Sequence, residues 1–177
     1  SLRALGYSER VPAAELAAFE VRARARGSSG FRVFQRDGGR ALERDGEAVV
    51  LRVIEPLAGN AGALGVNALS IPAARAAILS ARDSGEPTAS SGFRLTQSDA
   101  GSSGIVLYQA LYDRVPRNAA ERASAFTGVL FVTVDTEALL GGLGRELAAD
   151  AAHAATGPGV HWCLLDTDGS ASPTPLA

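Results

Sequence analysis

The stretch from Val53 to Gly85 constrains the fold more than any other part of the sequence, because it changes from strand to irregular crossover to helix. Its first residues close an apolar run, which Pro56 stops because proline has no N–H for a sheet ladder. Asn60, Gly62 and Gly65 follow in a segment that predicts irregular backbone. We expect this polar, glycine-rich crossover to form the rim of a pocket.

A helix is predicted directly after the crossover. Ser70 has the side chain of a helix cap, Pro72 is tolerated in a first turn, and Gly85 fits the position just past the last turn. Apolar residues recur between them at helical spacing. They are Ala74, Ala77, Ile78 and Ala81. This side of the helix is therefore expected to be packed.

Composition restricts the class of protein. The 177 residues are 46% hydrophobic and 20% charged, as in a globular fold of one domain or two small lobes. The net charge of −2 gives no electrostatic basis for binding nucleic acid, and all 17 basic residues are Arg. No run approaches the roughly 18 apolar residues of a membrane span, and the N-terminus does not resemble a signal peptide. The single cysteine, Cys163, cannot form an internal disulfide.

Periodicity predicts an alternation of helices and strands. Helices are expected at 9–26, 70–85, 118–125 and 136–155, and strands at 31–37, 48–54, 92–97, 104–112, 128–135 and 160–166. The almost wholly apolar strand at 48–54 is expected to be central. Asn118 and Asp135 are expected to cap the helices that follow them. Hairpin-like strand pairs with helices between them predict an α+β fold of two lobes, each with a mainly antiparallel sheet, divided near Pro116.

The sequence favours a module that binds over one that turns over substrate. It has no GxSxG, HExxH, paired CxxC or P-loop motif, and no cofactor or metal site is predicted. His161, Cys163 and Asp166 contain the residue types of a nucleophilic site, but an ordinary, partly buried strand is the favoured interpretation. Glu55 either lines the pocket rim or ends a strand in solvent, and the sequence leaves both alternatives open.

Several short motifs, taken in order, resemble the CHASE domain. This is the extracellular sensor module of bacterial histidine kinases, nucleotide cyclases and plant cytokinin receptors. The central motif is the pattern IEP…N…LG-x-[DN]-x-x-S…R…A…A…G between Ile54 and Gly85. The others are FEVRARARG before GFRVF near the N-terminus, FRLTQ at 93–97, GIVLYQALY at 104–112 and GVLFVTVDTEALL at 128–140. The resemblance covers about residues 8–150, and its specificity lies in the order and spacing of the motifs.

The resemblance implies a particular architecture. An N-terminal stalk helix would occupy residues 1–27. A membrane-distal PAS-like lobe over 28–118 would hold the ligand. A membrane-proximal PAS-like lobe over 119–177 would couple to a transmembrane helix. The alternative that this lobe is truncated stays open.

The resemblance also implies a ligand site. In the plant receptors, the Asp of the LG-x-D motif contacts the adenine of the hormone, and Asn67 stands in that position here. A carboxamide both donates and accepts hydrogen bonds, so it can pair with the N6 and N7 edge of adenine. The other expected ligand-binding residues are Glu55, Asn60, Leu69, Ala89, Leu95, Gln97, Gly104, Val106 and Tyr108. For Leu95 and Val106, plain core packing is an equal alternative.

The sequence leaves three alternative functions for this chain. The first is an extracytoplasmic small-molecule sensor of a receptor in the cell inner membrane, with a histidine kinase or cyclic-di-nucleotide enzyme as output. Its partners would be a small ligand, the receptor's own transmembrane helices and output domain, and a second copy in a homodimer. The second is a dimerisation or protein-interaction module without a small ligand, formed through the stalk helix. The third, a hydrolase that uses Cys163 and His161, has the weakest support, so the domain itself is expected not to be an enzyme.

Overall fold

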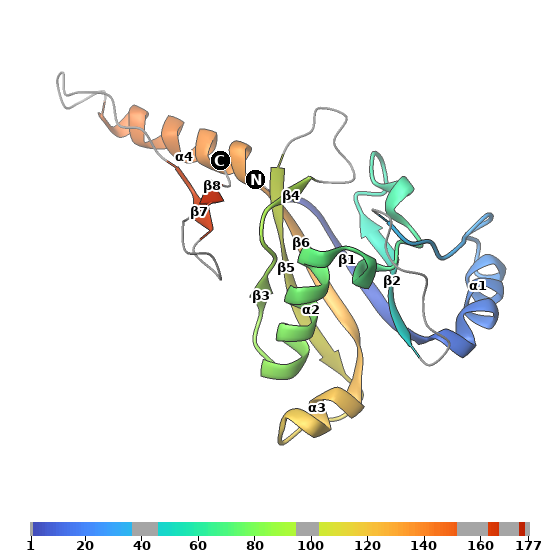
Figure 1. Cartoon of the computed structure of the whole chain (residues 1–177). Helices are drawn as coiled ribbons and strands as arrows, with labels where there is room; N and C mark the ends of the chain where they lie inside the picture. Colours follow the sequence, from blue (N-terminus) through green and yellow to red (C-terminus); the bar gives the residue numbers. More distant parts are fainter. Residues whose placement is uncertain (1, 37–45, 95–102, 152–162, 167–173, 176–177) are drawn as a thin grey trace.

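An antiparallel sheet forms the centre of the molecule in the computed structural model, which describes residues 2–36, 46–94, 103–151, 163–166 and 174–175 (Figure 1). The strand order is β2-β1-β6-β5-β3, with β4 also paired to β5. The strands are β1 (Leu2–Pro12), β2 (Glu47–Glu55), β3 (Thr88–Ala89), β4 (Phe93–Arg94), β5 (Ser103–Tyr112) and β6 (Phe126–Asp135). Two short strands, β7 (Leu165–Asp166) and β8 (Thr174–Pro175), pair separately. The predicted α+β class and the antiparallel pairing are confirmed.

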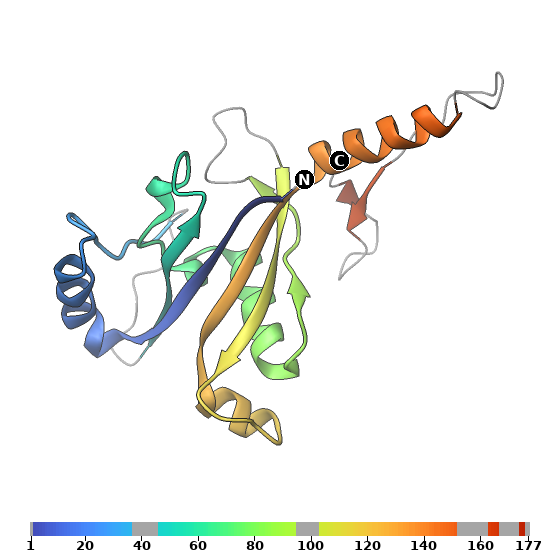
Figure 2. The ribbon, with the colours of Figure 1, turned by 180° about the vertical axis from the view of Figure 1, so that it is seen from behind.

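Helices lie on both faces of this sheet. They are α1 (Leu16–Ala25), α2 (Pro72–Ser84), α3 (Ala119–Ala125) and α4 (Thr136–Ala151), with single 3₁₀ turns at Ala13–Glu15, Ala61–Ala63 and Ala68–Ser70. Helix α2 covers one face, across β5 and β6, whereas α1 lies at the β1–β2 edge and α4 runs away from the end of β6 (Figures 1 and 2). We call the face under α2 the inner face and the opposite one the outer face.

The N-terminal segment departs from the prediction. Residues 2–12 form β1, so the expected helix from residue 9 is wrong in its first turn, and a stalk helix over 1–27 is not confirmed. The cause is tertiary: Ala4, Gly6 and Ser8 are buried at every second position, which is the period of a strand between two neighbours. That pairing with β2 and β6 overrides the local helical pattern.

The chain beyond Pro116 joins the same sheet as the chain before it. Strand β6 lies between β1 and β5, and Tyr108 of β5 stands opposite Phe131 of β6. The division into two PAS-like lobes near Pro116 is therefore not confirmed. Of the strand expected at 160–166, only Leu165–Asp166 is a strand in the described part, and 160–162 lie outside it.

Helix α2 follows its prediction closely. Pro72 occupies the first turn, and Gly85 ends the helix in the left-handed region with φ of 83°. The expected apolar stripe is buried, as Ile78 at its centre is fully inaccessible. Ser70 is not the cap, because Ile71 occupies that position. The Ser70 hydroxyl instead donates to the Asn67 carbonyl at 2.6 Å.

The two other expected caps are confirmed. The Asn118 side chain accepts from the backbone N–H of Glu121 at 2.9 Å at the start of α3. Asp135 Oδ1 accepts from the backbone N–H of Ala138 at 2.8 Å at the start of α4. Each cap satisfies one of the free N–H groups of a helix N-terminus.

Strand β2 is the end strand of the sheet, yet both of its edges are hydrogen-bonded. On the edge away from β1, Leu51 N donates to Val66 O, and Gly65 N donates to Leu51 O, each at 3.0 Å. Phe34 adds a further layer, since its N–H donates to Gly65 O at 3.0 Å and its carbonyl accepts from Asn67 N at 2.9 Å. The sequence predicted β2 to be a central strand, and this prediction is wrong because β2 lies at the end of the strand order. The crossover takes the place of the missing strand, and the strand expected at 31–37 is reduced to the bridge at Phe34.

Both faces of β2 are also buried. Val49, Leu51 and Ile54 belong to the main core under α2. Ala48 and Val50 join a second core, which α1 covers on the outer face. A strand buried on both faces explains why this segment of the sequence is almost continuously apolar.

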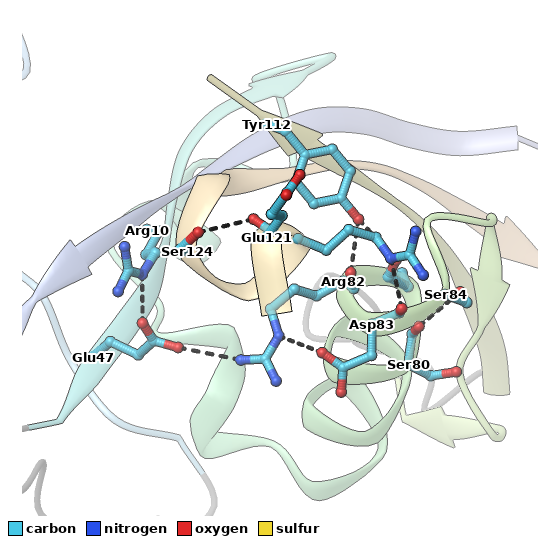
Figure 3. A network of polar contacts seen from close by, with 11 residues as sticks. Arg10, Glu47, Ser80, Arg82, Asp83, Ser84, Tyr112, Glu121 and Ser124 are labelled. Atoms are coloured by element: carbon cyan, nitrogen blue, oxygen red, sulfur yellow. Dashed lines mark hydrogen bonds and ion pairs between the residues drawn. The ribbon is translucent and has the colours of Figure 1, made fainter. Parts of the chain in front are cut away.

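A polar network fastens the C-terminal end of α2 to three strands (Figure 3). Glu47 of β2 pairs with Arg10 of β1 and lies 3.7 Å from Arg82 of α2. Arg82 also pairs with Asp83 at 2.7 Å. The Tyr112 hydroxyl of β5 donates to the backbone carbonyl of Arg82 at 2.7 Å. These contacts hold α2 over the inner face.

The close packing at Gly6 gives a test of the sheet arrangement. A Cβ on Gly6 would lie 2.2 Å from Val53 O and 2.5 Å from the Phe131 ring. We expect Gly6→Ala to lower the free energy of unfolding by about 2 kcal/mol or more, because the strand backbone cannot move away. Gly62→Ala is the control, because nothing lies within 4 Å of its new methyl group. Urea unfolding monitored by circular dichroism measures both, and equal effects would contradict the β1–β6 packing.

Candidate functional site

The inner face of β5 brings together three of the expected ligand-binding residues. Gly104, Val106 and Tyr108 occupy alternate positions of the strand and are all buried. Val106 stands opposite Thr133 of β6, which is itself opposite Ala4 of β1. A row of small or hydroxyl-bearing side chains therefore crosses the sheet beneath α2.

Tyr108 is the most unusual member of this face. Its side chain is 5% exposed, and its hydroxyl has no hydrogen-bond partner among the described residues. Its ring lies 6.4 Å from that of Phe131, centroid to centroid. Burial raises the pKa of the Tyr108 hydroxyl, so the group stays neutral and keeps its proton. The hydroxyl oxygen itself is not fully enclosed by the described residues, so the phenol can donate a hydrogen bond to water or to a ligand.

Ser90 completes the row on the β3 side. Its backbone N–H donates to Val106 O at 2.8 Å, and its side-chain oxygen accepts from Val106 N at 3.0 Å. The hydroxyl proton of Ser90 is not used by either contact. Ser90 is buried, whereas Ala89, the residue expected here, is exposed.

Asn67 lies at a different place, on the outer edge of β2. Its Oδ1 accepts from Val49 N at 3.0 Å and from Leu69 N at 3.2 Å, and its Nδ2 donates to Gln35 Oε1 at 3.0 Å. The side chain is fully buried. The carboxamide therefore replaces a backbone carbonyl in the β2 ladder and fixes the crossover to the strand.

The other expected residues divide between these two places. Asn60 is buried and donates to Pro56 O at 2.6 Å, which closes the turn after β2. Leu69 is part of the main core, and Glu55 is exposed at the end of β2. Leu95 and Gln97 lie outside the described residues. Asn67 lies one strand spacing beyond β2, so four spacings of about 4.8 Å, or about 19 Å, separate it from the strand of Tyr108.

Two residues of the inner row were not expected from the sequence. Ser90 follows a two-residue strand that no periodicity reveals. Thr133 lies on β6, where its hydroxyl-bearing side chain is buried. The alternation of VTVD between Val132 and Asp135 could have placed Thr133 on the same face as Asp135.

The inner row is connected directly to α4. Asp135 follows Thr133 by two residues and stands opposite Gly104. Its carboxylate accepts from Arg3 Nη2 of β1 at 2.8 Å as well as from Ala138 N of α4. The Ala138 N–H and the Arg3 guanidinium together lower the pKa of Asp135, so the carboxylate stays ionised at neutral pH.

Comparison with known families now identifies the chain. A family model described as the CHASE domain matches residues 1–176. The chain belongs to the CHASE family. CHASE domains are extracellular sensor domains of membrane signalling receptors, and the family is sensory, not catalytic. A search of curated proteins found no match for this CHASE domain.

Three further sequence predictions concern membrane spans, metal ligands and the residues around Cys163. No described helix is long and apolar enough to cross a membrane. In the described part of the chain, no three His, Cys, Asp or Glu side chains are grouped as metal ligands. Cys163 is exposed, and His161 lies outside the described residues.

An open pocket of about 530 Å³ lies apart from both groups of expected residues. Glu20, Arg24, Gly30, Arg32 and Val33 line it, between α1 and the segment before Phe34. None of the expected ligand-binding residues contributes to it. Glu20 and Arg24 are committed to the backbone of that segment, through Val33 N at 2.7 Å and Phe31 O at 2.9 Å.

The structural assignment of Asn67 can be tested by substitution. We expect Asn67→Ala to lower the free energy of unfolding by about 2–4 kcal/mol, because Val49 N and Leu69 N lose a buried acceptor. Asn67→Asp keeps both acceptors but loses the donor to Gln35 Oε1 and buries a carboxyl group, so a loss of about 1–3 kcal/mol is expected. Chemical denaturation of the two variants measures the difference. Equal stability of the wild type and Asn67→Ala would show that the carboxamide does not hold the crossover.

Two tyrosines on β5 provide a matched pair. Tyr112→Phe removes a hydroxyl that donates to Arg82 O, and a loss of about 1 kcal/mol is expected. Tyr108→Phe removes a hydroxyl without a described partner, so the ligand-free protein should be equally stable or up to about 1 kcal/mol more stable. Thermal unfolding of both variants gives the comparison. A large destabilisation by Tyr108→Phe would mean that its hydroxyl already has a structural partner.

Proposed function

We propose that this CHASE domain binds a small, uncharged molecule on the inner face, between α2 and the strands β5 and β6. The main support is Tyr108, which is buried on this face and whose hydroxyl keeps its proton and has no partner among the described residues. A ligand acceptor at this position would give that hydroxyl a hydrogen-bond partner. Ser90 and Thr133 would supply further hydrogen bonds from the neighbouring strands.

The electrostatics of the inner face favour a neutral ligand. Asp135 is the only charged side chain among the described buried residues, and it is already paired with Arg3. An ion on this face would lose its hydration without gaining a free counter-charge. A heterocycle of the adenine type, with ring nitrogens that accept hydrogen bonds, fits a group of hydroxyl donors. Asn67 would act by holding the crossover in place.

The path from the site to the receptor would be β6 followed by α4. Thr133 belongs to the row that would contact the ligand, and α4 begins three residues later at Thr136. The Asp135 cap fixes the start of α4 to the end of β6. A ligand that binds more tightly to one position of β6 would shift the position of α4. The receptor's transmembrane helices would respond to that shift, and so would the output domain on the other side of the inner membrane.

The experiment is a thermal-shift screen of the 177-residue chain with adenine, related purines and a panel of uncharged heterocycles. A molecule present at 100 times its dissociation constant should stabilise the fold by about 2.7 kcal/mol. We expect this shift to be lost in Tyr108→Phe and retained in Tyr112→Phe. A shift that survives Tyr108→Phe would move the site elsewhere. Absence of any stabilising molecule would favour the alternative of an interaction module without a small ligand.

A further inference from the structure

The open pocket of about 530 Å³ beside α1 is lined mainly by charged side chains. Glu20 and Arg24 come from α1, and Gly30, Arg32 and Val33 come from the segment that follows the helix. Figure 1 shows α1 at the end of the sheet opposite β3, so the pocket lies apart from the proposed ligand site on the inner face. A Cβ on Gly30 would meet no atom within 4 Å, so this side of the pocket is open.

Arg24 has an unused pair of donors at this pocket. Its Nη1 donates to Phe31 O at 2.9 Å and lies 3.4 Å from Glu20 Oε2. Its Nε and Nη2 make no hydrogen bond among the described residues. A guanidinium has five N–H donors in a planar fork, and an adjacent pair of its nitrogens can bind both oxygens of one carboxylate. The contacts of Nη1 therefore fix the side chain, while its Nε–Nη2 edge is available to a ligand.

The charges that line the pocket do not cancel. Two guanidinium groups, of Arg24 and Arg32, face one carboxylate, of Glu20. Glu20 is already engaged, because its Oε1 accepts from Val33 N at 2.7 Å and its Oε2 is paired with Arg24. Arg32 is exposed and makes no ion pair or hydrogen bond among the described residues. The pocket therefore has an excess positive charge, carried by a side chain that is free to contact a ligand.

From these observations we infer that the pocket binds a small monocarboxylate, whose carboxylate contacts Arg24 and Arg32. One negative charge on the ligand matches the excess positive charge of the lining. Val33, which packs against the second core, supplies an apolar contact for a short aliphatic part of the ligand. A cation would meet a carboxylate that is already paired, and a phosphate dianion would leave a negative charge uncompensated beside Glu20.

The site is connected to the crossover through the segment that it would bind. Phe34 directly follows the pocket-lining residues; its N–H donates to Gly65 O at 3.0 Å, and its carbonyl accepts from Asn67 N at 2.9 Å. A carboxylate on Arg24 and Arg32 would join α1 to this segment and, through Phe34, to the crossover. Because the ligand binds the folded chain, it should also raise the thermal stability.

The test is a titration of the ¹⁵N-labelled 177-residue chain with sodium butyrate at low salt, followed by NMR at the arginine Nε–H signals. The Arg24 signal is identified by its loss in Arg24→Lys. We expect it to shift and saturate at millimolar butyrate, and not to do so with sodium chloride at equal ionic strength. Arg32→Gln should weaken butyrate binding about tenfold, because the ligand loses a charged hydrogen bond.

Arg22→Gln is the matched control for Arg32→Gln. Arg22 is exposed on the same helix as Arg24 and does not line the pocket. It stands two residues from Arg24, so its side chain lies on the opposite side of α1. Arg22→Gln removes the same charge from the chain, and we expect it to bind butyrate as the wild type does.

Several results would overturn the inference. One is the absence of a saturable butyrate shift at Arg24 Nε, and another is unchanged butyrate affinity in Arg32→Gln. Equal weakening by Arg22→Gln would show only a general attraction of anions to α1. Tighter binding of inorganic phosphate than of butyrate would contradict the assignment to a carboxylate. Tyr108→Phe should bind butyrate as the wild type does, so this test is independent of whether the inner face binds a ligand.

Discussion

The fold depends on the closure of the free edge of β2 by the crossover that follows it. A strand with two buried faces has no solvent to satisfy its backbone, so each N–H and C=O on its edge needs a partner. Gly65 and Val66 supply two of these partners, and the Asn67 carboxamide supplies a third to Val49 N. Gly65 is required in this arrangement, since a Cβ there would lie 1.9 Å from Arg32 O and its φ is 88°. The contacts of the crossover therefore explain how it stabilises β2, without any contribution from a ligand.

This dependence separates what the sequence could reveal from what it could not. Helix α2 was predicted with its buried stripe and its terminal glycine, because helix signals are local and repeat every turn. Strands β2, β5 and β6 were also predicted, since their alternation or apolar runs are long. The first half of β1 was not predicted. Its strand conformation comes from pairing with residues more than 100 positions away, and no local pattern contains that information.

The site was only partly accessible to sequence reasoning for a related physical reason. Tyr108 and Val106 were expected as ligand residues, and their burial on one face is consistent with this, while the binding itself stays a prediction. Asn67 was expected as the recognition residue because of its place in a motif. A motif position is equally well explained by hydrogen bonds that hold a loop, and the sequence does not distinguish a bond to Val49 N from one to a ligand. Ser90 and Thr133 join the row only through strand register, which the fold determines.

Strand β6 connects the two faces of the sheet in a way that has consequences for signalling. Its alternate residues Phe131 and Thr133 point to the inner face, while Leu130 and Val132 lie on the outer face. A ligand that shifts β6 must therefore also alter the outer face and, through Asp135, the direction of α4.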